Sequence, residues 1–152
     1  MALKLAELVN LILSAVVGGM YWGPWLALSR SLRTFDSGVF LAIVNRLNQN
    51  MAPLMTFLTP IGLLSTLPTL YLSFGSRPTT FYLTLAGFVF FLIALFVTIR
   101  VEVPMVGQMI NWNASAMPPH WQQLRDRWVH FHVIRVVAGF TGLTLLLAGA
   151  IF

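Results

Sequence analysis

Four long apolar runs constrain the fold of this chain more than any other feature. They cover approximately residues 7–29, 51–74, 79–100 and 121–150. A helix of about 20 residues is long enough to cross a hydrocarbon core about 30 Å thick. Because backbone polar groups inside a bilayer must bond within the protein, such runs form helices or closed barrels. We therefore predict an all-α, integral membrane four-helix bundle.

The composition agrees with a membrane protein. Of the 152 residues, 58% are hydrophobic and 9% are charged, whereas a soluble domain carries about 25% charged residues. The length suits a single transmembrane domain, 1–152, whose partner is the lipid bilayer. The net charge of +5 does not indicate a nucleic-acid partner, because the basic residues lie between the apolar runs and act as topology signals. The chain has no cysteine, which excludes disulfides and cysteine-ligated metals.

Shorter helices and helix ends are expected between the spans. Residues 39–50 and 105–112 are predicted to form short extra helices, and Asp36 or Ser37 is placed to cap the first of them. Aromatic rings near the end of the first span are expected to form an interfacial belt. These rings are Tyr21, Trp22 and Trp25.

Prolines mark the irregular places in the spans. The second span contains Pro53, Pro60 and Pro68, and each removes a backbone donor, so this helix is expected to kink and to wall a cavity. Pro104 is expected to end the third span, since the residue before a proline disfavours helix.

The basic residues predict the orientation in the membrane. The loops 30–50 and 100–127 carry six arginines, whereas the opposite side carries only Lys4 and Arg77. By the positive-inside rule, both termini are predicted to be non-cytoplasmic. Most polar side chains gather on the cytoplasmic side, so we expect a polar vestibule at that end and an almost purely apolar opposite half. The six arginines are Arg30, Arg33, Arg46, Arg100, Arg125 and Arg127.

The last span begins with a polar stripe. At about 100° per residue, one helical face carries two indoles, two guanidinium groups, an imidazole and two glycines. His130 lies about 200° from His132 on such a helix, so the pair is not a two-ligand chelate and no metal site is predicted. The residues of the stripe are Trp121, Arg125, Trp128, His132, Arg135, Gly139 and Gly142.

Arg135 is the residue of this stripe that most needs a partner. It lies about three turns into its helix, and a charge at that depth usually faces the bundle interior with a partner. Glu102 is the natural partner, being the acidic residue near the end of a span on this side. The alternative is that Arg135 snorkels to the headgroups. His132 is either a hydrogen-bonded structural residue or a base.

Two motifs resemble the anthrone-oxygenase-like family of small four-span membrane proteins. They are Val103-Pro104-Met105 with Trp112 eight residues after the proline, and Arg125-x-x-Trp128-x-x-x-His132-x-x-Arg135. The chain departs from the family pattern at Val106, where an asparagine is expected. The resemblance implies a four-helix bundle and, as an activity, the oxidation of a hydrophobic aromatic ketone by O2.

The resemblance also implies roles for residues. His132 would be the base that forms an enolate, Arg135 would stabilise the oxyanion, and Glu102 would orient one of them. Trp128 and Trp112 would be flat walls. Further residues expected in the substrate pocket are Asn45, Asn48, Arg125 and Asn111.

Cofactors and other functions stay open at this point. No cofactor is predicted, because the carboxylates are too few for a di-iron bundle. A haem on His132 or His120 is the alternative. Two non-catalytic functions compete with the oxygenase: a membrane accessory or scaffold subunit, whose protein partner is unknown, and a binder of a hydrophobic aromatic molecule.

Overall fold

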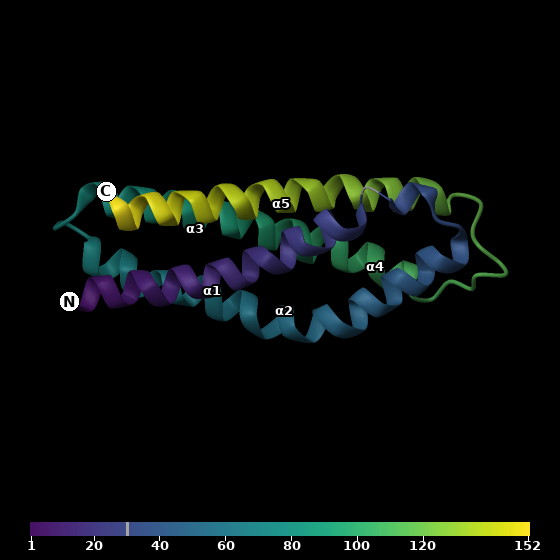
Figure 1. The fold of residues 1–152 in the computed structure, drawn as a ribbon, viewed down its shortest axis with the longest axis horizontal. Helices are drawn as coiled ribbons and strands as arrows, with labels where there is room; N and C mark the ends of the chain where they lie inside the picture. The colour runs from purple at the N-terminus through teal and green to yellow at the C-terminus, as the bar shows by residue number, and fades with distance from the viewer. Residues whose placement is uncertain (30) are drawn as a thin grey trace.

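The computed structural model describes residues 1–29 and 31–152, so Arg30 lies outside the described residues. Four helical segments are long and apolar enough to cross a membrane, which confirms the predicted all-α four-helix bundle (Figure 1). They are Ala2–Leu28, Ser37–Ser73, Pro78–Met109 and Trp121–Ile151. The elements in order are α1 (Ala2–Pro24), the π-helix η1 (Trp25–Ser29), the 3-10 turn η2 (Leu32–Thr34), α2 (Ser37–Ser73), α3 (Pro78–Val97), the π-helix η3 (Thr98–Glu102), α4 (Val103–Met109) and α5 (Trp121–Ile151).

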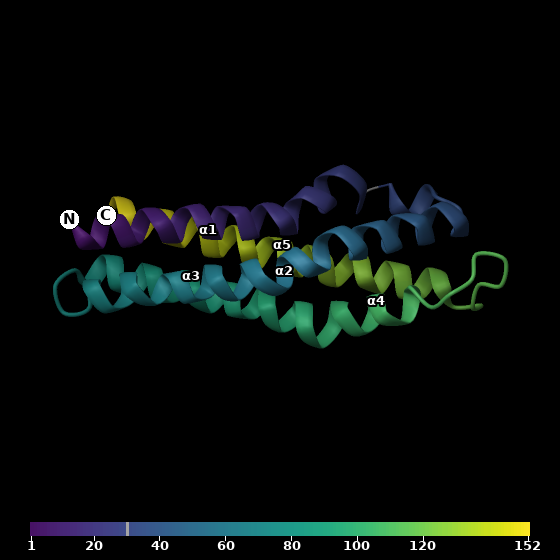
Figure 2. The same cartoon turned by 90° about the horizontal axis from the view of Figure 1, so that it is seen from below.

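The bundle has two different ends. Both termini and the turn at 74–77 lie at one end, here called the terminal end (Figures 1 and 2). Residues 31–36 and the connection 110–120 lie at the other, here called the loop end. The main packing pairs are α3 with α5 and α1 with α2.

Close approach of α3 and α5 depends on two glycines. A Cβ added at Gly87 would lie 2.9 Å from the carbonyl oxygen of Gly142, and one added at Gly142 would lie 3.0 Å from that of Gly87. Small residues of this kind let the backbones of membrane helices touch, so that many weak contacts add up. The second half of the predicted stripe thus becomes a helix–helix contact.

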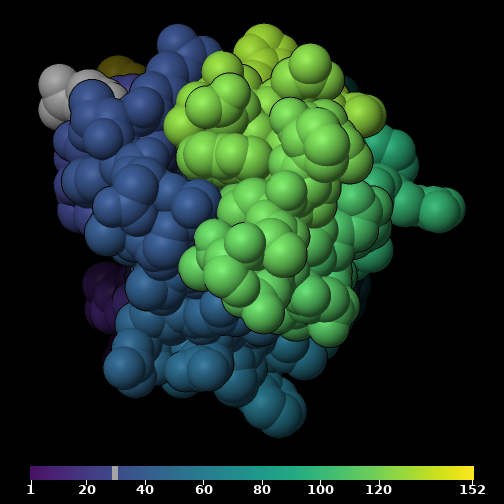
Figure 3. All heavy atoms as spheres, turned by 90° about the vertical axis from the view of Figure 1, so that its right-hand side faces the viewer, coloured from purple at the N-terminus to yellow at the C-terminus, as the bar shows by residue number. Residues whose placement is uncertain are grey.

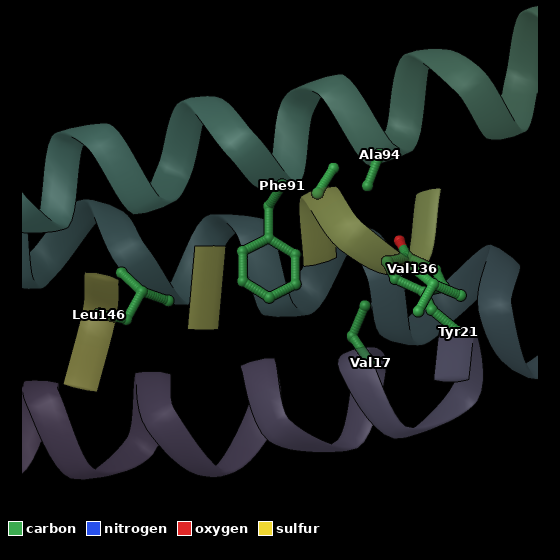
Figure 4. Close-up of a cluster of buried hydrophobic side chains, with 7 residues drawn as sticks. Val17, Tyr21, Phe91, Ala94, Val136 and Leu146 are labelled. Carbon is green, nitrogen blue, oxygen red and sulfur yellow. The ribbon is translucent and has the colours of Figure 1, made fainter. Parts of the chain in front are cut away.

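A buried cluster joins α1, α3 and α5 beside this contact (Figure 4). Tyr21 belongs to it and is fully buried, so the expectation that it lies in an interfacial belt is wrong. The reason is Gly139, whose missing side chain leaves room for the ring: a Cβ there would lie 2.7 Å from Tyr21 Cδ2. The labelled members are Val17, Tyr21, Phe91, Ala94, Val136 and Leu146.

The second span is one bowed helix. Residues 39–50, expected as a separate helix, are continuous with it in α2. Asp36 caps its start as predicted, with Oδ1 accepting a hydrogen bond from the Val39 amide at 2.9 Å. The helix contains its three prolines without ending at any of them, and Figure 1 shows it curving away from the other helices in its middle. Each proline removes one backbone donor from the helix, and this is a usual cause of bending.

The third span does not end at Pro104, contrary to the sequence expectation. It continues through the π-helix η3 into α4, and the Val103 amide donates to the carbonyl of Thr98. The wider turn places Pro104 in the first turn of α4, where a missing amide costs little. The proline therefore starts a new helical register instead of ending the span.

The terminal half is not as apolar as the sequence led us to expect. Asn10 is buried, and its Oδ1 accepts hydrogen bonds from Ser14 at 3.1 Å, Ser65 at 3.2 Å and Thr66 at 3.0 Å. Glu7 is also buried, 3.0 Å from the Lys4 ammonium, which in turn donates to the carbonyl of Ala150 at 2.9 Å. These bonds tie α1 to α2 and α5, so the polar groups serve packing between helices.

Candidate functional site

Three buried polar side chains meet where η3 faces α5. Glu102, His132 and Arg135, here called the charged triad, are 4%, 3% and 6% exposed. Arg135 Nη1 lies 2.5 Å from Glu102 Oε2, so the predicted partnership of these two residues is confirmed. Arg135 is sixteen residues from Ile151, which places it about 24 Å along α5 from the terminal end. At that depth a buried charge needs the opposite charge beside it.

His132 Nδ1 contacts both of the other members. It lies 2.8 Å from Arg135 Nη2 and 3.3 Å from Glu102 Oε1. Because a guanidinium only donates and a carboxylate only accepts, the two contacts require different tautomers of the ring. When Arg135 donates to Nδ1, the ring proton is on Nε2. When Nδ1–H donates to Glu102, Nε2 keeps a lone pair and has the form of a base.

Within the described part of the chain, His132 Nε2 has no hydrogen-bond partner and is buried. Trp128 Nε1 and Arg135 Nε are also buried and have no hydrogen-bond partner among the described residues. The rings of Trp128 and His132 lie 5.9 Å apart at an interplanar angle of 36°. Buried polar atoms left without partners are rare and mark places where a water or ligand would bind.

Two further residues complete the surroundings of Arg135, and neither was expected at the site from the sequence. Thr98 Oγ1 accepts from Arg135 Nη1 at 3.4 Å, and the Arg135 guanidinium lies 5.0 Å from the centre of the Tyr21 ring. Thr98 could have been found from its spacing, since it lies four residues before Glu102 on the same helical face. Tyr21 could not, because its position depends on how α1 packs against Gly139.

The charged triad lies in the wall of a largely apolar cavity of about 530 Å³ between α1, α2, α5 and the α3–η3–α4 segment. This volume is in the range that holds a drug-sized molecule. The polar groups of the wall come mainly from the charged triad, Thr98, Thr59 and Asn48, and most other lining residues are aliphatic or methionine, including Met51 and Met55. The bow of α2 thus walls a cavity, as its prolines predicted.

An apolar cluster fills the bundle between this cavity and the loop end. It is here called the end cluster, and its members are Leu32, Phe40, Leu41, Val44, Met105, Met109 and Trp128. Trp112, Met117 and Trp121 pack against it. Figure 3 looks onto this end, where atoms of the 110–120 connection and the start of α5 meet those that lead into α2. The expected polar vestibule is therefore a largely apolar cavity, which the end cluster separates from the loop end.

The structure brings together some of the predicted pocket residues and not others. Asn48 and Trp128 line the cavity with the charged triad. Trp112 packs against the end cluster instead, and Asn111 is exposed and donates to the carbonyl of Gly107 at 2.7 Å. Asn45 is half-buried outside the cavity lining.

The remaining charges of the stripe lie nearer the loop end. Arg125 is buried, with Nε 3.0 Å from Asp126 Oδ1 and its guanidinium 5.1 Å from the centre of the Trp121 ring. Arg33 also reaches Asp126 Oδ1, at 3.3 Å. His130 is exposed whereas His132 is buried, so the two rings lie on different faces of α5, as their angle on the helix predicts. Among the described residues, no group of three or more His, Cys, Asp or Glu side chains is placed to hold a metal ion.

Comparison with known proteins identifies one family. Residues 40–145 match the model of a family described as anthrone oxygenase, which confirms the resemblance drawn from the two motifs. Among curated proteins and among solved structures, no match was found. The matched residues include η3, α4 and the charged triad.

Proposed function

Because the chain belongs to the anthrone oxygenase family, we propose that it oxidises a hydrophobic aromatic ketone of the anthrone class with O2. The observation that carries the proposal is the charged triad, buried in the wall of an apolar cavity. The cavity supplies space for a flat apolar molecule, and the triad supplies a base, a cation and a carboxylate at one point of its wall. We place the reaction at the loop-end side of the membrane, on the cytoplasmic side by the arginine distribution.

His132 is the base of the proposed reaction. Anthrone has an acidic CH₂ group opposite its carbonyl, and removal of one proton gives an enolate. Nε2 can take this proton when Nδ1–H donates to Glu102 Oε1, 3.3 Å away. Glu102 then holds the tautomer in the way a carboxylate orients a catalytic histidine. Arg135 provides the positive charge beside which the enolate oxygen is stabilised.

The oxidation itself uses O2 as the oxidant. The enolate carbon gives electrons to O2 and forms a C–O bond, and the resulting peroxide takes up the proton. Loss of the remaining C–H proton and cleavage of the O–O bond produce the second carbonyl and release water. The sum is anthrone plus O2 giving anthraquinone plus water, which balances without an external reductant.

Oxygen uptake tests this role. Purified protein in lipid vesicles, given anthrone, is expected to consume O2 and to form anthraquinone above the spontaneous background. His132→Ala should lower kcat by about 10²-fold, the usual size of a lost general base. His130→Ala, which changes an exposed histidine two residues away, is the matched control and should keep the rate. Equal rates for the wild type and His132→Ala would show that His132 is not the base of the reaction.

The same cavity also favours a second function, the binding of a hydrophobic aromatic molecule without turnover. Its largely apolar wall and its volume of about 530 Å³ suit a ligand whether or not the ligand reacts. Anthraquinone binding with no oxygen uptake in the presence of anthrone would favour this binder over the oxygenase.

A haem is the alternative cofactor in this scheme. Of the two histidines considered as axial ligands, His132 lines the cavity and His120 is exposed beside the start of α5. A Soret band in the absorption spectrum of protein purified with its own lipids would replace the cofactor-free route by a haem-dependent one.

A further inference from the structure

The cavity reaches the outer surface of the bundle along one side. Its lining contains an inner stripe of α2 that is buried or half-buried, with Met51, Met55 and Thr59, and an outer stripe that is exposed. On the facing segment, Leu95, Thr98, Glu102, Val106 and Gly107 are similarly buried or half-buried, and the other lining residues are exposed. These two exposed rows are here called the lateral mouth, and they are Ala52, Thr56 and Pro60 on α2 with Ile99 on η3, Val103 on α4 and Ile110 directly after α4.

The lateral mouth is apolar. None of its six residues is charged, and the one hydroxyl, of Thr56, is satisfied by donating to the carbonyl of Ala52 at 2.8 Å. Both flanking segments, Ser37–Ser73 and Pro78–Met109, are long and apolar enough to cross a membrane. An exposed apolar surface on such a helix faces the hydrocarbon of the bilayer.

The position of the lateral mouth across the membrane agrees with contact between the mouth and the hydrocarbon. Pro60 is thirteen residues from Ser73, about 20 Å along α2, and Ala52 is about 32 Å along it. Since the hydrocarbon core is about 30 Å thick, the α2 row of the mouth extends from inside the core to headgroup level, whereas Val103 and Ile110, about 38 and 48 Å from Pro78 along their own segment, lie at and beyond the headgroups. Exposed Arg100, about 33 Å from Pro78 along its own segment, lies where a guanidinium reaches the headgroups.

The other route into the cavity is filled. A molecule arriving from water at the loop end would have to pass the end cluster, where Phe40 and Met109 are fully buried. Opening that cluster would expose apolar side chains to water, which is unfavourable. Entry through the lateral mouth needs no such exposure, because the ligand and the residues around it stay in an apolar medium.

We propose that the lateral mouth connects the cavity to the bilayer, that a lipid acyl chain occupies it at rest, and that apolar ligands enter through it from the membrane. The class of ligand in this proposal rests on the proposed function, whereas contact of the cavity with lipid does not depend on any reaction. An aromatic ketone suits this route, because its rings are held in hydrocarbon while its oxygen points toward the headgroups.

Contact with lipid can be measured with a fluorescent label on the cavity wall. The chain has no cysteine, so Met55→Cys carries a single bimane label. Two positions on the same helix are matched controls: Leu54 is exposed outside the cavity, and Leu58, which is half-buried against the same cluster as Met55 (Figure 4), lies outside the cavity lining. A label at exposed Ala114 in the loop end reports aqueous contact.

In vesicles with brominated acyl chains, we expect the label at Met55→Cys to be quenched nearly as much as that at Leu54→Cys. The label at Leu58→Cys should be quenched several-fold less, and aqueous iodide should quench only that at Ala114→Cys. Iodide quenching at Met55→Cys would make the cavity an aqueous vestibule and overturn the proposal. Quenching there as weak as at Leu58→Cys would make the cavity closed and would overturn it as well.

Entry of a ligand is tested separately with anthraquinone, followed by quenching of tryptophan fluorescence. Ala52→Phe narrows the mouth, and Ala42→Phe makes the same change at an exposed position of α2 outside the cavity lining. Ala52→Phe should slow binding and release together, each by about tenfold, with Kd nearly unchanged, because a barrier acts on rates. Rates equal to those of Ala42→Phe would overturn entry through the mouth. Failure of the wild type to bind anthraquinone would count against the proposed function, while lipid contact at Met55 would still be decided by bromine quenching.

Discussion

Glu102 and Arg135 can each be buried in the protein interior only because the opposite charge of the other lies beside it. Their contact of 2.5 Å joins a carboxylate and a guanidinium that are both nearly inaccessible. Burial of either charge alone would cost far more than the net value of the pair, since the lone charge keeps its desolvation penalty. The pair therefore fixes the relative position of η3 and α5 more than it adds to stability.

This asymmetry predicts the result of a double-mutant cycle. Arg135→Met should lower the free energy of unfolding by about 3–5 kcal/mol, because Glu102 is left as an uncompensated buried charge. Glu102→Leu combined with Arg135→Met should lose markedly less, since no charge remains. Unfolding in mixed micelles measures both. Arg127→Met is the control at an exposed position and should stay within about 0.5 kcal/mol of the wild type. A single variant no less stable than this control would contradict the buried-pair argument.

At the level of single residues, the sequence predicts what depends on one helix. The angle between His130 and His132 follows from helical geometry alone, and so does the stripe that holds Arg135. Glu102 was identifiable because few acidic residues are present, four in the whole chain. Contacts that need a third helix were not predictable, and Tyr21 under Arg135 is such a contact.

Among the elements, α2 has the most to do with the cavity. Pro60 is exposed on the cavity rim, and its ring nitrogen cannot donate to the carbonyl of Thr56. Pro68 also lacks a backbone donor, but it lies further along α2, outside the cavity lining. Replacing each proline in turn therefore distinguishes the effect of a bend beside the cavity from the general effect of a proline in this helix.

Pro60→Ala should straighten α2 and narrow the cavity. The restored amide can donate to the Thr56 carbonyl, so the melting temperature should rise or stay equal, while anthraquinone affinity should fall by about tenfold, or 1.4 kcal/mol. Fluorescence titration in vesicles measures the affinity. Pro68→Ala is expected to keep the wild-type affinity. Equal affinity in both variants would show that the bend at Pro60 does not shape the cavity.

The lengths of the elements were harder to predict than their number. Rules for proline apply to α-helical hydrogen bonding, and η3 changes that bonding just before Pro104. A π-turn leaves no pattern in hydropathy, because it adds one residue to a segment that is apolar throughout. The sequence therefore shows where a helix is disturbed without showing whether it ends.

Over the whole molecule, the four spans followed from hydropathy, but the polar interior of the terminal half did not. Glu7, Asn10 and Ser14 share one face of α1 by their spacing, and this spacing was a usable signal. It was missed because hydropathy averages over all faces of a helix, and three polar residues barely change the mean. The bonds of Asn10 to α2 became visible only once the two helices were side by side.

Orientation is also a property of the whole molecule, and the arginine distribution predicts it. Ser76 at the terminal end and Ala114 at the loop end are both exposed, so each can carry the single cysteine of a variant. In intact cells, an impermeant maleimide should label Ser76→Cys, whereas Ala114→Cys should react only after permeabilisation. The opposite pattern would place both termini in the cytoplasm and reverse the predicted topology.

The π-turn between Thr98 and Glu102 also holds one residue more than an ordinary α-helical turn would. Deleting one residue there would keep the span apolar and long enough, and it would let the turn close with ordinary α-helical bonding, which leaves α4 nearly in phase with α3. Met105 and Met109 would still face the end cluster, whereas Pro104 would meet the carbonyl of an ordinary helical turn, where its ring and its missing amide disturb the helix. The number of residues in this stretch therefore determines whether the turn is a π-turn or an α-turn, which hydropathy does not reveal. A gap placed here in a sequence alignment would indicate that the turn differs between the aligned proteins.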